Sequence, residues 1–387
     1  MVKNLLVEGW RKINHSYSMV NQYQLLELKK IGKINLYHND QPYYRSEWSP
    51  EKNSAGFEYD KLNEISSIPH LNDEALADIT YRISYPYRFG ESKSKKLFIF
   101  GTSEYQVVTD EMICIGDTSK NYNKLPLNVI TPSNWSKEGF INLGFNQEQV
   151  TVIPHGVDPT IFSPISSELR DQYRALLGAD RDTFVILSVG AMTENKGIDI
   201  LLSAYILLSQ KNRKVMLVLK DQSKLYKLGG NDLVNQYCRR NGINIDSIQM
   251  REIIRGIVCI TDNLNLVQLN GLYGASDCYC SPYRAEGFNI PPLEAAVAGV
   301  PIVVTKGGST DDYVDPSFSL MIESQKKCID GRYFLEPNLE SLVEQLNILI
   351  ENKSSMLDLN KARSIILERF SWGTVSARLL DKLLENE

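Results

Sequence analysis

Several features that would place this chain in a special class of protein are missing from its sequence. The six cysteines include no Cys-x-x-Cys pair and no spacing typical of a disulfide framework, which favours a reducing compartment such as the cytoplasm. No apolar run approaches the roughly 18 residues of a transmembrane helix. The opening residues, MVKNLLVEGW, lack the long apolar core and the cleavage site of a signal peptide. We expect a cytoplasmic protein and leave open a peripheral contact with the inner face of the membrane.

An excess of basic residues is also missing. The formal net charge of -5 argues against nucleic acid as a partner. With 43% hydrophobic and 23% charged residues, the composition is that of an ordinary globular protein. A chain of 387 residues exceeds the usual size of one hydrophobic core, so we expect two domains.

What the sequence does contain is an alternation of strand-like and helix-like segments. Short apolar runs are separated by longer segments that carry apolar residues at helical spacing. This alternation predicts an α/β fold. The expected strands lie at residues 4–8, 34–38, 79–84, 97–100, 184–189, 215–219, 257–262, 277–281 and 302–305. The expected helices include residues 18–30, 198–210, 264–273, 339–350 and 372–384.

The most informative stretch runs from Pro282 to Val304 and reads PYRAEGFNIPPLEAAVAGVPIVV. It predicts a loop after a buried strand, a helix that begins at Pro291 or Pro292, and then the next strand. Glu286 would lie in the loop, and Glu294 in the first turn of the helix. In an open α/β sheet, loops at the carboxyl ends of the strands bind ligands. The alternative is that Glu286 is a plain loop carboxylate and that Glu294 only favours the positive end of the helix.

Two glutamates with seven residues between them, followed by a helix and an Ala-Gly-x-Pro turn, resemble the donor site of retaining glycosyltransferases with the GT-B fold, specifically family 4. The strand and capped helix at Asn128–Trp135 and the turn at Pro154–Pro159 are also similar to this family. The resemblance implies two doubly wound Rossmann-like domains facing each other across a cleft. It places an acceptor-binding domain at residues 1–163 and a donor-binding domain at 164–371, with a last helix at about 372–387 that crosses back to the N-terminal domain. His155, in the turn, is expected to bond to backbone rather than to act in catalysis.

The resemblance also implies roles on the donor side. Glu286 would hold hydroxyls of the donor sugar, and Glu294 would bind the ribose diol, since a carboxylate accepts two hydrogen bonds at once. Gly307 and Gly308 would let backbone N–H groups approach phosphate. The backbone N–H groups that would contact the sugar or the β-phosphate belong to Gly287, Phe288 and Asn289. The residues that would contact the base are Thr261, Asp262 and Asn263.

The loop at Gly190–Gly197 resembles the family's phosphate loop, in which an arginine after the first glycine and a lysine five residues later hold the diphosphate. Lys196 is present, but Ala191 stands at the arginine position. Fixed cations stabilise the negative charge of the leaving diphosphate. We therefore expect Lys220, at the end of a predicted strand, to act together with Lys196. The alternative for Lys220 is an ordinary lysine that faces solvent.

The turn after the first strand is the expected acceptor or phosphate side of the first domain. The family usually has a glycine pair there, whereas this chain has only Gly9. His15 and Ser16 are candidates for hydrogen bonds to a hydroxyl or a phosphate at the start of the next helix. The alternative is that Ser16 caps this helix and that His15 lies on the surface.

Polar and aromatic side chains follow the later strands of the same domain. Glu104 is a candidate acceptor-binding group or general base; alternatively, Ser103 or Thr102 caps a helix there. Aromatic rings in the neighbouring loops offer flat faces to sugars, and arginines suit an acidic acceptor. Half-buried tyrosines and paired arginines are the ordinary alternatives. The rings and arginines are Tyr43, Tyr44, Trp48, Tyr85 and Tyr87, and Arg45, Arg82 and Arg88.

The resemblance implies a retaining, hexosyltransferase-type enzyme that takes a sugar from a UDP-, GDP- or dTDP-linked donor. The acceptor would be a hydroxyl of a saccharide, a lipid-linked sugar or another molecule, in the synthesis of a glycan, polysaccharide or glycoconjugate. The resemblance implies a front-face reaction in which the departing phosphate helps to deprotonate the acceptor, without an enzyme nucleophile, a bound metal or a cofactor. An epimerase or phosphorylase of the same fold, and a sugar-nucleotide binding protein without turnover, remain as alternatives.

Overall fold

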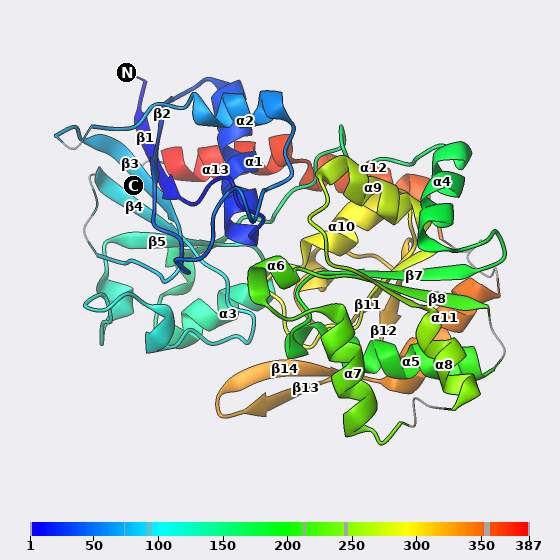
Figure 1. The fold of residues 1–387 in the computed structure, drawn as a ribbon. Helices are drawn as coiled ribbons and strands as arrows, with labels where there is room; N and C mark the ends of the chain where they lie inside the picture. Colours follow the sequence, from blue (N-terminus) through cyan, green and yellow to red (C-terminus); the bar gives the residue numbers. More distant parts are fainter. Residues whose placement is uncertain are drawn as a thin grey trace. The chain divides into compact units, whose positions relative to one another are not determined.

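The computed structural model describes residues 2–72, 74–90, 92, 94–211, 214–243, 247–351 and 357–385. The chain forms two compact units, each built around a six-stranded sheet (Figure 1). Unit 1 consists of Met1–Gly156, Asp330–Arg332 and Arg369–Glu387, and unit 2 of Val157–Ile329 and Tyr333–Glu368. All of the described strand pairings in both sheets are parallel, so the predicted α/β fold with two Rossmann-like domains is confirmed.

Unit 1 has the strand order β2-β1-β3-β4-β5-β6. The order of addition reverses between β1 and β3, which makes the carboxyl ends of these two strands a topological switch point. The strands are β1 (Asn4–Gly9), β2 (Asn35–Asp40), β3 (Ala77–Ile83), β4 (Ser94–Phe100), β5 (Leu127–Thr131) and β6 (Val150–Val152). The helices are α1 (Ser16–Ile31), α2 (Tyr59–Ser66), α3 (Asn134–Leu143) and α13 (Trp372–Leu384), with short 3-10 turns at Asp110–Met112, Tyr122–Lys124 and Gln147–Gln149.

Unit 2 has the strand order β12-β11-β10-β7-β8-β9, and its switch point lies between β7 and β10. The strands are β7 (Phe184–Val189), β8 (Val215–Lys220), β9 (Ile257–Ile260), β10 (Cys278–Ser281), β11 (Ile302–Thr305) and β12 (Ser319–Ile322). The longer helices are α4 (Ser167–Leu177), α5 (Ile198–Gln210), α7 (Gly230–Arg240), α9 (Leu266–Ala275), α11 (Leu339–Ile350) and α12 (Leu359–Phe370). The shorter ones are α6 (Ser223–Tyr226), α8 (Ile248–Arg255), α10 (Ile290–Val297) and the 3-10 turns η4 (Glu194–Lys196) and η5 (Ser309–Asp312).

The apolar strands of unit 2 are explained by their burial between helices. Leu217 of β8 and Val303 of β11 are completely buried in one core with Leu201 of α5 and Leu346 of α11. Each completely buried side chain of this size contributes about 2 kcal/mol through the area removed from water. All six cysteines are free thiols, and the two in β10 lie inside this core.

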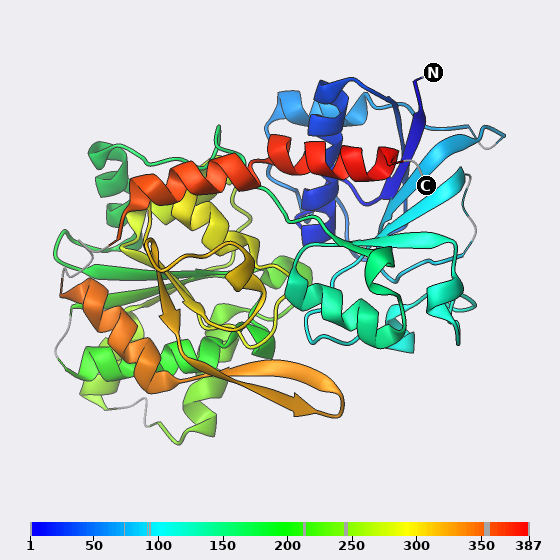
Figure 2. The same cartoon turned by 180° about the vertical axis from the view of Figure 1, so that it is seen from behind.

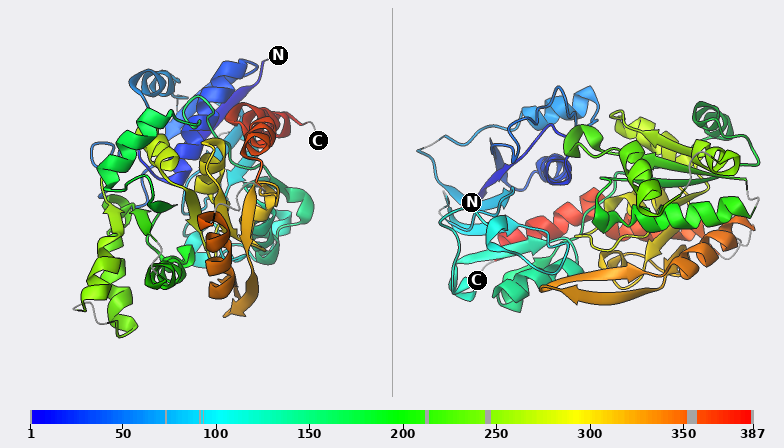
Figure 3. Two further views of the ribbon diagram at one scale, coloured as in Figure 1. Left: turned by 90° about the vertical axis from the view of Figure 1, so that its right-hand side faces the viewer. Right: turned by 60° about the horizontal axis from the view of Figure 1, so that its bottom comes forward.

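Two further elements complete the fold. The last helix, α13, belongs to unit 1 and lies alongside α1, as expected for a C-terminal helix that returns to the N-terminal domain (Figure 2). The strands β13 (Ser324–Ile329) and β14 (Arg332–Pro337) form a two-stranded hairpin apart from the main sheet of unit 2 (Figure 3). Within the described residues, no helix combines the length and the apolar character needed to cross a membrane.

Candidate active site

The candidate site of unit 2 lies at its topological switch point. The Lys196 loop (Gly190–Gly197) follows β7, and the Glu286 loop (Pro282–Asn289) follows β10. Because β7 and β10 are neighbouring parallel strands, both loops leave the same edge of the sheet. Ligands of doubly wound folds bind at this position.

An ion pair joins the two loops. Lys196 Nζ donates a hydrogen bond to Glu286 Oε1. Glu286 is only 5% exposed, so its carboxylate requires a compensating charge. Two residues that the sequence predicted for the donor site are thus in direct contact. Their charges balance in the structure described here, and an anionic ligand would compete with Glu286 for the lysine.

The backbone also clamps the two loops together. The N–H groups of Arg284 and Ala285 donate to the carbonyl of Asn195 at 2.6 and 3.3 Å, and Asn195 Nδ2 donates to the Ala285 carbonyl at 3.0 Å. Gly197 has a φ of 66°, and a Cβ atom there would lie 1.9 Å from the Pro282 carbonyl oxygen. Only glycine permits this close approach.

Arg284 ties the Glu286 loop to two further elements. Its guanidinium donates to both carboxylate oxygens of Asp199, at the start of α5, at 2.7 and 2.8 Å. It also contacts Glu336 of β14 at 3.3 Å, and the Arg284 carbonyl accepts from Leu335 N at 2.8 Å. A bidentate pair of this kind fixes position as well as charge. Arg284 therefore holds the loop that carries Glu286.

Glu294 lies in α10, behind the Glu286 loop. Its Oε2 accepts a hydrogen bond from the Tyr273 hydroxyl at 2.8 Å, and burial raises the pKa of Glu294 to about 7. The sequence predicted that Glu294 lies in the first turn of the helix. Because α10 begins at Ile290, Glu294 is instead the fifth residue of the helix and lies beyond its first turn. The alternative role at the positive helix end is therefore wrong.

The remaining residues of the Glu286 loop pack tightly. Asn289 adopts a left-handed conformation with a φ of 70° at the N-cap position of α10, and its side chain donates to Ser281 Oγ at 3.0 Å. Phe288 is 2% exposed and packs on Tyr313, whose hydroxyl donates to the Asn289 carbonyl at 2.6 Å. Gly287 lies between Glu286 and this packed pair. The conformation of the loop is therefore set before any ligand binds.

Other predicted phosphate contacts are engaged within the protein. Gly190 N donates to the Lys220 carbonyl at 3.0 Å, and Gly307 N donates to both oxygens of Asp311 at 2.9 and 3.1 Å. The prediction that the Gly307 amide is open to phosphate is wrong, because the Asp311 carboxylate occupies it. Lys220 is 5% exposed, so it does not face solvent, and its ammonium donates to the Asp221 carbonyl. Burial lowers the pKa of Lys220.

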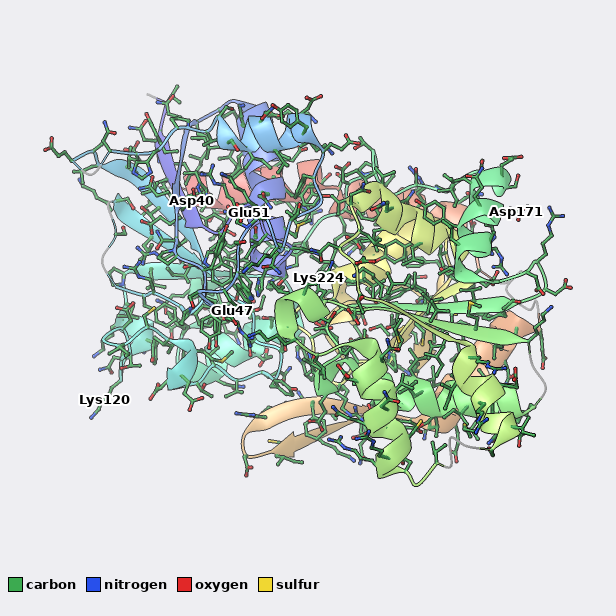
Figure 4. The ribbon with its side chains drawn as sticks, viewed as in Figure 1. Asp40, Glu47, Glu51, Lys120, Asp171 and Lys224 are labelled. Carbon is green, nitrogen blue, oxygen red and sulfur yellow. The ribbon has the colours of Figure 1, made fainter. Side chains whose placement is uncertain are left out.

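The residues predicted to contact the base follow β9, at the edge of the sheet. Thr261 and Asp262 are exposed, and Asp262 forms an ion pair at 3.2 Å with Lys224 of α6. Lys224 is labelled in Figure 4. In the sheet, β8 separates β9 from β7. Thr261 and Asp262 therefore lie at the same carboxyl ends of the strands as Lys196, but they follow β9, which is two strands away from β7.

The β1–α1 turn of unit 1 differs from the prediction. His15, not Ser16, caps α1: its Nδ1 accepts from Tyr17 N at 3.2 Å, and Ser16 is exposed. Burial lowers the pKa of His15 to about 4, so the ring is neutral at neutral pH. A Cβ atom on Gly9 would lie 2.6 Å from the Ile83 carbonyl oxygen, so strand packing explains this glycine.

Protein groups also occupy the amides of this turn. Lys12 N donates to Gln22 Oε1 at 2.9 Å, Ile13 N to Ser18 Oγ at 3.3 Å, and Asn14 N to the Asn53 carbonyl at 2.7 Å. A helix N-terminus attracts phosphate through free N–H groups. The amides of Lys12, Ile13 and Asn14 are therefore not open to phosphate. A hydrogen bond from His15 or Ser16 to a hydroxyl or a phosphate stays a prediction.

Glu104 lies beyond the carboxyl end of β4 and is exposed. No helix starts at Thr102 or Ser103, so the capping alternative is wrong; instead, Ser103 N donates to Ser136 Oγ at 2.7 Å. The Glu104 carbonyl accepts from Trp135 Nε1 at 2.7 Å, which fixes the backbone under the exposed carboxylate.

His155 and the arginines of unit 1 have structural partners. His155 is 4% exposed, packs between Phe100 and Trp372, and has its pKa lowered to about 3 by burial. A catalytic role is not indicated by this environment. The predicted arginines are engaged as follows: Arg82 with Glu8 at 2.6 Å, Arg88 with Gln41 at 3.0 Å, and Arg45 over the Trp48 ring at 5.9 Å.

One protein-family model covers most of unit 2. The model described as "Glycosyl transferases group 1" matches residues 170–364, which is half of the chain. The chain belongs to the glycosyl transferases group 1 family. Among curated relatives, an uncharacterized glycosyltransferase, MJ1607 of Methanocaldococcus jannaschii, is 26% identical over 253 residues, covering 64% of this chain and 57% of that protein. The chain spans about half the length of the curated relatives that it matches.

Two solved structures share the complete fold. The glycosyltransferase of Rickettsia africae ESF-5 aligns over 100% of both chains with a TM-score of 0.70 at 14% identity. The Anabaena protein Alr3699/HepE, in complex with UDP-glucose, aligns over 98% of this chain and 99% of its own with a TM-score of 0.67 at 15% identity. These likenesses confirm the GT-B type of fold.

In this member of the group 1 family, sequence reasoning missed two parts of the candidate site. Arg284 gives no local signal, because its partners lie 85 and 52 positions away in the chain. The hairpin that supplies Glu336 did have a signal: Asp330-Gly331 between strand-like runs is typical of a two-residue turn, and both residues have positive φ values of 49° and 77°.

Proposed function

We propose that this protein is a retaining glycosyltransferase that moves a sugar from a nucleoside diphosphate sugar to an acceptor hydroxyl. The observation that carries the proposal is the ion pair of Lys196 and Glu286 at the switch point of unit 2, with Glu294 in the helix that follows. One cation and two carboxylates at a ligand-binding edge suit the diphosphate, the sugar and the ribose of such a donor.

The two carboxylates divide the donor between them. Glu286 holds hydroxyls of the donor sugar, and backbone N–H groups of Gly287, Phe288 and Asn289 contact the sugar or the β-phosphate. Glu294 accepts hydrogen bonds from the ribose diol, because one carboxylate can accept two at once. The base lies toward the exposed residues after β9, among them Thr261.

Lys196 supplies the positive charge for the leaving diphosphate. It exchanges its bond to Glu286 for a phosphate oxygen, and Glu286 is then satisfied by sugar hydroxyls. The departing phosphate takes the proton of the acceptor hydroxyl on the face where the new bond forms, so that the step needs neither an enzyme nucleophile nor a metal. Lys220 reaches the diphosphate only by exchanging its bond to the Asp221 carbonyl.

The donor and the setting are part of the proposal. UDP-glucose is the first donor to test, because Anabaena HepE was solved with it. We place the reaction in the cytoplasm and in the synthesis of a glycan or glycoconjugate. Ala191 at the arginine position favours one rival, a sugar-nucleotide binding protein without turnover, because a site with one fewer cation stabilises the leaving group less.

The test is nucleotide release from UDP-, GDP- and dTDP-linked sugars by the purified protein and two variants. Lys196→Met and Glu286→Gln should each lower kcat by about 100-fold or more, the loss typical of one preorganised electrostatic group. Lys306→Met is the matched control, since it breaks the exposed ion pair with Glu323 in the same unit and should change kcat little. Binding without nucleotide release from any of these donors would overturn the transferase and support the rival.

A further inference from the structure

The hairpin of β13 and β14, labelled in Figure 1, is bonded to the Glu286 loop at the end that lies away from its turn. Leu335 of β14 is 1% exposed, and its backbone N–H donates to the Arg284 carbonyl at 2.8 Å. The neighbouring Glu336 accepts a hydrogen bond from the Arg284 guanidinium at 3.3 Å. The Glu286 loop is therefore bonded both to the Lys196 loop and to the hairpin.

The same end of the hairpin packs on the loop that follows β11. We call residues 306–310 the Gly308 loop. A Cβ atom on Gly308 would lie 2.9 Å from Leu335 Cδ1, so the leucine side chain lies directly against the glycine. The hydroxyl of Ser324, the first residue of β13, donates to the Lys306 carbonyl at 2.6 Å. Both strands of the hairpin therefore contact the Gly308 loop.

Tyr283 connects the Glu286 loop to the Gly308 loop. Its side chain is 1% exposed, and its hydroxyl lies 2.9 Å from Thr310 Oγ1 and accepts from Thr310 N at 3.2 Å. A Cβ atom on Gly308 would lie 2.5 Å from the same hydroxyl. The hairpin and the two loops thus meet around one small residue. Because close-packed interiors transmit strain, a displacement of the hairpin would move both loops.

The parts of the proposed site that bind the ribose and the base are held by other elements. Glu294 accepts from the Tyr273 hydroxyl of α9, and Asp262 pairs with Lys224 of α6. In the sheet, β7 and β8 lie between β10, which precedes the Glu286 loop, and β9, which precedes Asp262. The contacts that hold the sugar side of the site are therefore different from those that hold the ribose and base side.

We infer that the hairpin determines the specificity of the site for a sugar nucleotide over the corresponding nucleoside monophosphate. Arg284, Leu335 and Glu336 are the positioning residues: they hold the Glu286 loop where it meets the β-phosphate and the sugar. The inference rests on the proposed function, which assigns these two groups to that loop. A misplacement of about 1 Å in such a group can cost about 100-fold. A nucleoside monophosphate lacks both groups, so its binding should depend little on the hairpin.

The experiment measures by isothermal titration the Kd values of three ligand pairs: UDP-glucose with UMP, GDP-mannose with GMP, and dTDP-glucose with dTMP. Arg284→Lys keeps the positive charge but loses the bidentate bond to Asp199. For the pair that the wild-type protein binds, this variant should raise the Kd of the sugar nucleotide about tenfold or more and that of the monophosphate less than about twofold. Glu336→Gln should raise the Kd of the sugar nucleotide about threefold, because its carboxylate is partly exposed.

Two control variants leave the positioning contacts intact. Arg181→Lys makes the same substitution in an exposed ion pair of unit 2, with Asp171 at 2.8 Å, and should change neither Kd. Ile329→Ala alters the hairpin at a side chain that is 59% exposed and should also change neither Kd. The double variant of Arg284→Lys and Glu336→Gln should lose less affinity than the product of the two single losses, because both residues act through one contact.

Two results would overturn the inference: an equal rise of both Kd values in Arg284→Lys, which would indicate a general structural role, or an unchanged Kd for the sugar nucleotide. Thermal midpoints recorded in parallel show that each variant is folded at the titration temperature. Glu336 is partly exposed, so Glu336→Gln should fold and carry the same test even where Arg284→Lys does not. Failure of the wild-type protein to bind any of the three sugar nucleotides would instead contradict the proposed function of unit 2, so the two failures are distinguishable.

Discussion

Glu294 has an ionisation state that should set the pH dependence of donor binding. Burial raises its pKa from 4.5 to about 7. A carboxylate accepts two hydrogen bonds from a diol, whereas its protonated form donates one and accepts fewer. Donor affinity should therefore be highest above pH 7 and fall as the pH drops through the pKa of Glu294. At pH 6 we expect UDP-glucose to bind about tenfold more weakly than at pH 8.

Isothermal titration at pH 6, 7 and 8 would measure this dependence. UDP-glucose is a suitable ligand because both ends of its diphosphate are esterified and it gains no proton in this range. Glu294→Gln should bind weakly at all three values, without the pH dependence. Equal affinity of the wild-type protein at pH 6 and pH 8 would count against the ribose assignment.

Glu294 and its neighbours show how much of the candidate site can be predicted from the sequence alone. The motif that carries Glu286 and Glu294, together with the lysine of the Lys196 loop, is sufficient to predict which residues lie at the carboxyl edge of the sheet in unit 2. It does not show that Lys196 and Glu286 pair with each other, because that contact depends on the close approach of Pro282 to Gly197, where a Cβ atom would lie 1.9 Å from the Pro282 carbonyl oxygen. Nor does it show Arg284, whose importance arises only when β14 and α5 are brought beside it.

At the scale of elements, Gly197 should be essential for the way in which the Lys196 loop meets the Glu286 loop. Gly197 and Gly178 both have left-handed φ values, 66° and 76°, but only Gly197 faces another backbone segment. Gly178→Ala should cost about 1 kcal/mol of unfolding free energy for the unfavourable φ alone. Gly197→Ala should cost about 2 kcal/mol more, because Pro282 must move to admit the Cβ atom.

Urea denaturation of both variants measures this difference through the transition midpoints. The displacement of Pro282 would also separate Lys196 from Glu286, so Gly197→Ala should lose most of its nucleotide release, whereas Gly178→Ala, at the end of α4, should retain it. Equal destabilisation by the two substitutions would show that the contact with Pro282 has no energetic weight.

Whole elements are predictable where the apolar period is strong. The bounds of β7, α5, α11 and α13 agree with those expected from the sequence. The segment after β4 is different: a Thr-Ser pair suggested a helix cap, but Ser103 instead bonds to Ser136, 33 positions away. Local capping signals cannot anticipate a long-range partner. The same limit applies to the β1–α1 turn, where Asn53 and Gln22 occupy amides that a glycine-rich turn would leave open.

At the scale of the whole molecule, the chain closes unit 1 with its own last helix. Trp372, the first residue of α13, is 4% exposed and stacks on Tyr23 of α1 at 4.9 Å with an interplanar angle of 9°. A Cβ atom on Gly156 would lie 2.7 Å from the Trp372 ring, so the end of the first segment of unit 1 packs directly on this side chain. Removal of the Trp372 ring leaves a cavity between α1, α13 and the segment that ends at Gly156.

Trp372→Ala should therefore destabilise unit 1 by about 3 kcal/mol without weakening the nucleotide site of unit 2. Each unit has its own sheet, so we expect two calorimetric transitions, of which UDP-glucose raises only the one that belongs to unit 2, by mass action. The substitution should lower the other transition and leave the Kd for UDP-glucose unchanged. Lys382→Ala, on the same helix, is the control and should shift neither transition by much, because its ion pair is with the exposed carboxylate of Glu385. If Trp372→Ala lowered the transition that UDP-glucose raises, the ring would stabilise unit 2 as well as unit 1, contrary to this prediction.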